Sequence, residues 1–144
     1  MTEPTEAIIS IKPNFAEAIF SKTKTVELRR RVPMFPIGTR LWIYATLPVG
    51  AVLGTAEIIG RYEGTPDEIW ETFYNEVGIS RTQFDEYFEE SQKAIGLVLS
   101  NVKMGYAASI STLRKLRPGF QPPQVTAKLT CTEASLLTTH MFGS

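Results

Sequence analysis

Cysteine and histidine are almost absent from this chain of 144 residues, and their scarcity excludes several kinds of site. The single cysteine, Cys131, excludes an internal disulfide and any metal site built on several thiolates. We expect Cys131 to be a small buried apolar residue. A zinc site, a Ser-His-Asp triad or a Cys-His pair would each depend on the one histidine, His140. We therefore expect neither a metal nor a cofactor.

Long apolar segments are also missing. No apolar run approaches the roughly 20 residues that cross a membrane, and no signal peptide is visible. We therefore expect a cytoplasmic protein that makes no membrane contact. Glycine-rich loops of the kind that cradle phosphates are absent as well, so a bound anion would need charged side chains.

Charge is balanced in total but unevenly placed. The chain has 15 basic and 15 acidic residues, so no net field would attract nucleic acid to the whole surface. Residues 12–31 hold six basic and two acidic residues, whereas residues 63–90 hold nine acidic residues against Arg81 alone. This distribution favours a localised anion site near the N-terminus over a basic coat.

The segment 22–31 carries five of the 15 basic residues and one acid, Glu27. In an extended strand, Val26 and Leu28 would point to one face, and Glu27, Arg29 and Arg31 to the other. One face of the strand would then be apolar and point to the core, and the other would be a polar row in which a carboxylate lies beside guanidinium groups. That polar row is suited to holding an anion, although the alternative is a salt-bridged strand whose charges only keep the surface hydrated.

Periodicity and capping signals predict one α+β domain over residues 1–144, with a core over residues 7–131 and a patternless tail, 132–144. Short strands separated by proline and glycine turns favour a small mixed β-barrel with a helix near the N-terminus and a helical insert. The expected strands are 7–11, 23–30, 41–45, 51–59, 94–102 and 125–131. The expected helices begin at the caps Asn14, Thr65 and Ser80, and a short capped turn covers residues 111–116.

Several side chains could complete a binding surface beside the basic strand. Arg29 and Arg31 can each hold a phosphate with two hydrogen bonds, and Lys12 and Lys24 would add point charges. Tyr44 and its neighbour Trp42 offer aromatic faces, and stacking on a base contributes about 1–3 kcal/mol. Basic and aromatic side chains around one barrel opening would suit single-stranded nucleic acid or a nucleotide.

Three short motifs resemble the ASCH domain family of the PUA-like superfamily. They are Ser10-Ile-Lys-Pro13, Lys24-Thr-Val-Glu-Leu-Arg-Arg30 and Ile43-Tyr-Ala-Thr46. Weaker likenesses follow at Glu68-Ile-Trp70, Gly78-Ile-Ser80, Phe84-Asp-Glu-Tyr-Phe88 and Pro122-Pro-Gln124. The resemblance spans residues 8–124 and implies a PUA-like barrel with an RNA-binding cleft beside the first helix.

Some ASCH proteins are enzymes, and the resemblance invites comparison with two activities. Amidohydrolases that deacetylate N4-acetylcytidine use a lysine, a threonine nucleophile and a glutamate. Their lysine falls on Lys24, but the nucleophile position falls on Glu27, and the glutamate falls near Val77, one residue from Glu76. Glu27 would then have to activate water instead. In a ribonuclease, the basic residues would stabilise the transition state, with Glu27 as the base.

We therefore expect a binding module for RNA, a nucleotide or a modified nucleoside, with a regulatory role in RNA metabolism or translation. Catalysis by Lys24 and Glu27 is the alternative, and a third hypothesis has the acidic helical insert docking a protein partner through Trp70 or its Glu89-Glu90 end. The expected nucleic-acid-binding residues are Lys12, Lys24, Glu27, Arg29, Arg31, Tyr44, Thr46 and Gln124.

Overall fold

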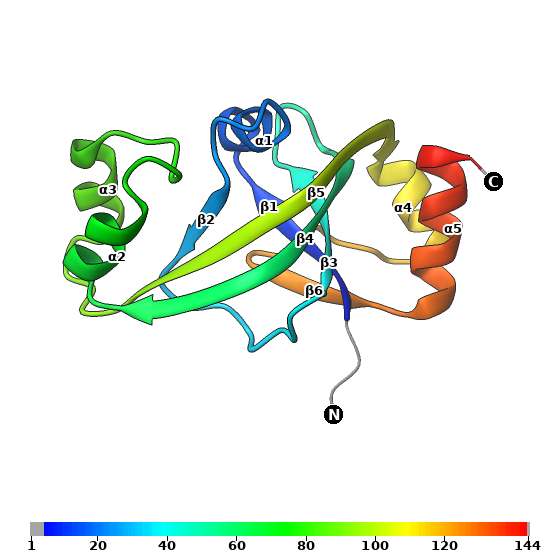
Figure 1. Cartoon of the computed structure of the whole chain (residues 1–144). Helices are drawn as coiled ribbons and strands as arrows, with labels where there is room; N and C mark the ends of the chain where they lie inside the picture. The colour runs from blue at the N-terminus through cyan, green and yellow to red at the C-terminus, as the bar shows by residue number, and fades with distance from the viewer. Residues whose placement is uncertain (1–4, 144) are drawn as a thin grey trace.

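The computed structural model describes residues 5–143 as a curved sheet with helices at both ends (Figure 1). The strands are β1 (Glu6–Ile11), β2 (Val26–Arg29), β3 (Arg40–Ala45), β4 (Ala51–Gly64), β5 (Ala94–Ser109) and β6 (Thr126–Leu129). The helices are α1 (Pro13–Phe20), α2 (Pro66–Phe73), α3 (Arg81–Tyr87), α4 (Ile110–Leu116) and α5 (Cys131–Phe142). The mixed α+β class is as predicted.

The strands form one open sheet in the order β2-β5-β4-β3-β1-β6. The β3–β4 hairpin is antiparallel, and β1 runs parallel to β3. The closed barrel that we expected is wrong, because within residues 5–143 the two edge strands β2 and β6 do not pair with each other. The long strands β4 and β5 bend instead, with register shifts along their shared ladder, so the sheet curves without closing.

Three apolar clusters stabilise this sheet. One packs α1 against one face of the sheet, with Ile9, Ile19 and Ile43 fully buried. A second packs α4 and α5 against the opposite side of β1 and β3, around Trp42 and Leu137. The third joins α2 and α3 to β2 and the start of β5. The helical insert therefore has its own core and forms one end of the molecule (Figure 1).

The helix starts follow the capping chemistry at two of the predicted positions. Thr65 and Ser80 each accept a hydrogen bond from a backbone N–H in the first turn and form complete capping boxes with Glu68 and Gln83. The cap predicted at Asn14 is wrong, because α1 already begins at Pro13, the position where a missing N–H is harmless.

The last residues differ from the expectation of a patternless tail. Thr130 ends β6 by capping α5, with Glu133 as its capping-box partner. Cys131 is the first residue of α5 and is exposed, so its predicted burial is wrong: the residues that face the core lie later in the helix. Within residues 5–143, no helix is long and apolar enough to cross a membrane.

Candidate functional site

A cleft of about 620 Å³ opens where α1, β2 and α3 meet the end of β1. Its walls come from segments far apart in the sequence, including the turn after β3 and the loop before β6. The lining residues are Ser10, Ile11, Lys12, Phe15, Lys24, Glu27, Leu28, Arg29, Thr46, Ile79, Gln83, Glu86, Tyr87 and Gln124. Three of them are basic and two are acidic, so one positive charge is in excess.

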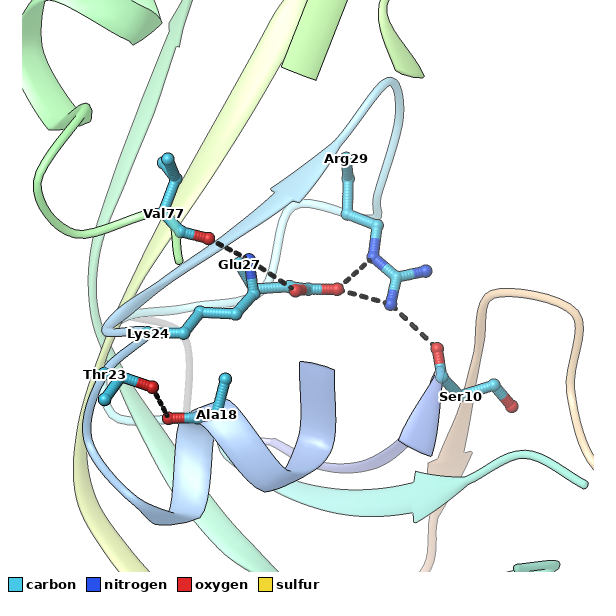
Figure 2. A network of polar contacts seen from close by, with 7 residues as sticks. All are labelled: Ser10, Ala18, Thr23, Lys24, Glu27, Arg29 and Val77. Carbon is cyan, nitrogen blue, oxygen red and sulfur yellow. Dashed lines mark hydrogen bonds and ion pairs between the residues drawn. The ribbon is translucent and has the colours of Figure 1, made fainter. Parts of the chain in front are cut away.

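The base of the cleft holds a chain of charged groups (Figure 2). Arg29 donates to Oε2 of Glu27 from Nε at 2.9 Å, and its Nη2 lies 2.7 Å from the same oxygen. Nη2 of Arg29 also donates to the carbonyl of Ser10 at 2.8 Å, which ties β2 to the end of β1. The Nζ of Lys24 lies 3.6 Å from Oε1 of Glu27. Glu27 therefore sits between two cations, as its place in the basic segment suggests.

Lys24 is buried, with 2% of its surface exposed. Its Nζ donates to the carbonyl of Val77 at 2.8 Å, and the ring of Phe15 lies 5.4 Å from the same atom. Burial lowers the pKa of Lys24 below its usual value, and the opposing effect of the Glu27 carboxylate does not restore it. A buried lysine of this kind can exchange a proton more readily than an exposed one.

The backbone around Val77 explains why Lys24 can be buried here. The N–H groups of Thr25 and Val26 both donate to the carbonyl of Glu76, so the loop between α2 and α3 is bonded directly to β2. Gly78 follows with a positive φ of +67°, and a Cβ there would lie 2.7 Å from the Cβ of Lys24. Only glycine combines this backbone conformation with such a close approach.

The cleft brings together six of the eight predicted nucleic-acid-binding residues. Lys24, Glu27 and Arg29 form its base, and Lys12, Thr46 and Gln124 lie in its walls. The strand alternation predicted for β2 is confirmed, because Val26 and Leu28 face the apolar cluster of the insert.

Tyr44 and Arg31 are not brought to the cleft. Tyr44 is 2% exposed and packs with Trp42 on the side of the sheet that α4 and α5 cover. β3 is also separated from β2 by β4 and β5, so its aromatic residues are not adjacent to the basic strand. Arg31 is exposed beyond the end of β2, where strand alternation no longer determines its direction.

Two aromatic residues line the cleft, Phe15 of α1 and Tyr87 of α3, and the predicted site included neither. Gln83, Glu86 and Tyr87 share one helical face, three and four residues apart, and turn it toward the cleft. The guanidinium of Arg30 lies 4.9 Å from the Tyr87 ring, so a residue of the basic segment supports this wall. The family likeness of residues 84–88 was the signal that could have identified Tyr87.

The amidohydrolase arrangement finds little support in this geometry. Glu76 is not among the lining residues, and the side chain of Val77 is fully buried. The group of this loop that contacts Lys24 is the backbone carbonyl of Val77. A backbone carbonyl cannot replace a carboxylate in proton transfer. Among residues 5–143, no three His, Cys, Asp or Glu side chains gather in a way that could hold a metal ion.

Residues 9–104 match the model of a family described as the ASCH domain. The chain belongs to the ASCH domain family. The match covers the whole basic strand, the first helix and the helical insert, which supply most of the cleft.

Proteins of Zymomonas mobilis are similar to this ASCH chain over most of its length. A protein named ASCH domain-containing ribonuclease is 40% identical over 119 residues, which cover 83% of this chain and 80% of that protein. The crystal structure of ASCH from Zymomonas mobilis has a TM-score of 0.93 and 36% identity, covering 96% of this chain and 97% of that one. A hypothetical protein from Leishmania major shares only the fold, with a TM-score of 0.57 and 11% identity over 96% of this chain and 94% of that one.

Membership of the ASCH family and the ribonuclease name of the Zymomonas mobilis relative support an RNA-related function for the chain.

Proposed function

We propose that the cleft binds single-stranded RNA. The observation that carries the proposal is the buried Lys24–Glu27–Arg29 cluster at the base of a hollow with one positive charge in excess. Three charged groups gathered in a mostly buried place are costly to desolvate, and their partial exposure toward one cleft gives a ligand access to them. The ribonuclease name of the 40% identical relative points to the same ligand class.

Each part of the cleft has a role in this proposal. Lys12 on the rim and Arg29 at the base contact phosphate, since Nη1 of Arg29 has no hydrogen-bond partner among residues 5–143. Tyr87, rather than Tyr44, stacks on a base. Both contacts from Arg29 fall on Oε2 of Glu27. Oε1, which lies 3.6 Å from Nζ of Lys24, accepts from a base amino group, and Thr46 and Gln124 add further hydrogen bonds.

RNA titrations followed by fluorescence anisotropy test this binding. Lys12→Ala should reduce the slope of log affinity against log salt by about 0.7, the value for one phosphate contact on a single strand. Lys103→Ala is the matched control, because Lys103 lies in a separate hollow with Glu57 and Phe142. The binding proposal fails if the unaltered protein binds no single-stranded RNA at low salt.

RNA cleavage in the same cleft is a second candidate, and the lowered pKa of Lys24 favours it. The neutral amine of Lys24 accepts the proton of a ribose 2′-hydroxyl, and the resulting oxygen attacks the adjacent phosphorus. The bond to the 5′-oxygen then breaks, and that oxygen takes a proton from solvent, which leaves a 2′,3′-cyclic phosphate. Arg29 stabilises the additional negative charge that develops on the phosphate in the transition state.

The pH dependence of cleavage distinguishes this step from contamination by another nuclease. Because the pKa of Lys24 is lowered, the rate should rise with pH and level off below the usual lysine value of 10.5. Lys24→Met should reduce the rate by roughly 10²–10⁴-fold while RNA is still bound, since a positioned proton acceptor contributes about that much. A rate that Lys24→Met leaves unchanged would contradict the role of Lys24.

A further inference from the structure

A long stretch of the chain carries no negative charge. Residues 91–132 contain six Lys and Arg and no Asp or Glu. This stretch forms β5, which begins beside the acidic insert, and then α4 and β6, which lie beyond the cleft. Figure 1 shows α2 and α3 at one end of the molecule and α4 and α5 at the other. An anionic chain leaving the cleft toward α3 meets acidic residues, whereas toward α4 it meets basic ones.

Two of these six basic residues form ion pairs, and Lys128 is exposed on β6. Lys93 pairs with Glu63 at 3.5 Å, and Arg117 pairs with Glu133 at 2.7 Å. Lys103 lines the separate hollow beside Phe142. Arg114 and Lys115, in the last turn of α4, are exposed and form no ion pair with any of residues 5–143. These two cations are therefore available to a ligand.

The backbone connects α4 directly to the cleft. Nε of Arg114 donates to the carbonyl of Phe120 at 3.1 Å, which fixes its guanidinium against the start of the loop before β6. Four residues later the same loop supplies Gln124 to the cleft wall. Four residues span at most about 14 Å, so Arg114 is held within a short length of RNA from the cleft.

The loop between these two points is held firmly in place. The hydroxyl of Ser10, which lines the cleft, donates to the carbonyl of Pro123 at 2.6 Å, and the Ser10 N–H donates to the carbonyl of Val125 at 3.2 Å. Adjacent prolines at 122 and 123 restrict the backbone further. A second link runs through β3, which contains Tyr44 and is followed directly by Thr46 of the cleft wall. Arg114 is near enough to Tyr44 for its positive charge to act on the Tyr44 hydroxyl.

We propose that the RNA bound in the cleft continues past Gln124 and places its next phosphates on Arg114 and Lys115. This track rests on the proposed function, because it extends the same bound strand. It gives the strand one direction across the surface, since the α3 side of the cleft carries Glu86 and the acidic insert. The track contacts phosphates only, so it adds affinity for longer RNA without selecting a sequence.

Affinity for RNA of two lengths tests the track separately from the cleft. The probes are single strands of about 4 and about 16 nucleotides, the range of site sizes for small folds that bind single strands. Lys115→Ala should weaken binding of the long RNA about fivefold at 0.1 M salt and reduce its salt slope by about 0.7, with the short RNA unaffected. Lys103→Ala removes the same charge from the same acid-free stretch and should change neither affinity.

Lys115 makes no side-chain hydrogen bond to residues 5–143, so its replacement should not disturb folding. Arg114→Lys is a second variant that keeps the charge while removing the fixed guanidinium geometry, and it should weaken only the long RNA. The track is overturned if Lys115→Ala leaves the long RNA unaffected, or if it weakens both lengths equally. If the unaltered protein binds neither RNA, the cleft proposal fails as well. This outcome is distinct from the two results for Lys115→Ala, in which the unaltered protein does bind RNA.

Discussion

A carboxylate held between two cations dominates the site at the scale of single residues. The side chains of Lys24 and Glu27 are 2% and 6% exposed, so neither charge is compensated by bulk water. Removing Glu27 leaves Lys24 buried without its carboxylate partner, whereas removing Lys24 as well takes that uncompensated buried charge away. The stability of this cluster therefore depends on its members acting together.

Glu27→Gln should lower the free energy of unfolding by about 3 kcal/mol, the lower end for a broken buried pair. Lys24→Met combined with Glu27→Gln should be less destabilised than the sum of the single variants by about 1–3 kcal/mol, measured by urea denaturation. The loss in Glu27→Gln should also be smaller in mildly alkaline buffer, because a lysine of lowered pKa favours folding as it loses its proton. Strictly additive losses would contradict the coupling.

Local pattern is sufficient to predict side-chain direction within one strand, but it does not predict which strands are neighbours. The period of two in β2 correctly assigns Val26 and Leu28 to the apolar cluster of the insert and Glu27 and Arg29 to the charged base of the cleft. The expectation that Tyr44 lines the cleft requires β3 to lie beside β2, whereas the sheet order places two strands between them. Sheet order depends on contacts between distant segments, which the local pattern does not encode.

At the scale of elements, α5 is the segment whose importance the sequence conceals. Its core-facing residues Ala134, Leu137 and Met141 are separated by serine, threonine and an exposed leucine, which obscures the helical pattern. Only packing against Trp42 and its neighbours identifies this helix as part of the core. Its start is visible in the sequence, like those of α2 and α3, because all three helices have complete capping boxes.

Leu137→Ala should lower the free energy of unfolding by about 2–5 kcal/mol, because its side chain is fully buried and the substitution leaves a cavity. Leu136→Ala is the matched control, since Leu136 is 49% exposed and should change stability by no more than about 0.5 kcal/mol. Chemical denaturation of both variants compares them directly. Equal effects would mean that α5 does not pack as described.

Glu133, in the first turn of α5, should also make the stability of the fold depend on pH. Hydrogen bonds from Arg117 lower the pKa of Glu133 to about 2, from a usual value of 4.5. A carboxyl group whose pKa is lowered by folding stabilises the folded state above its usual pKa and loses that contribution as pH falls toward the folded value. Between about pH 4.5 and 2, Glu133→Gln should therefore show a shallower loss of thermal stability than the unaltered protein.

The acidic insert was expected to dock a protein partner through Trp70, and that expectation stays a prediction. The centroid of the Trp70 ring lies 5.0 Å from that of Phe84, and the guanidinium of Arg81 lies over the same ring. Trp70 therefore stabilises the packing of the insert itself. A pull-down that is lost on substituting Glu89 and Glu90 would support the partner without disturbing this packing.

At the scale of the whole molecule, charge is divided between two ends of a bent sheet, with the cleft between them. The sequence indicates this division, because the acidic residues concentrate in 63–90 and are absent from 91–132. It does not indicate that the sheet stays open, since strand lengths and turns alone are compatible with a closed barrel. The bends in β4 and β5 that leave β2 and β6 apart depend on the register between these two long strands.

The central claim, that the cleft holds RNA, is tested most directly at Tyr87. Tyr87→Ala should weaken binding of a short single-stranded RNA by about 5- to 150-fold, which corresponds to the 1–3 kcal/mol of one stacked base. Tyr74→Ala is the control, because Tyr74 lies on the same helical insert, is 54% exposed and does not line the cleft. Tyr74→Ala should leave affinity unchanged in the same anisotropy titration. An affinity that Tyr87→Ala leaves intact, or that both variants reduce equally, would contradict binding in this cleft.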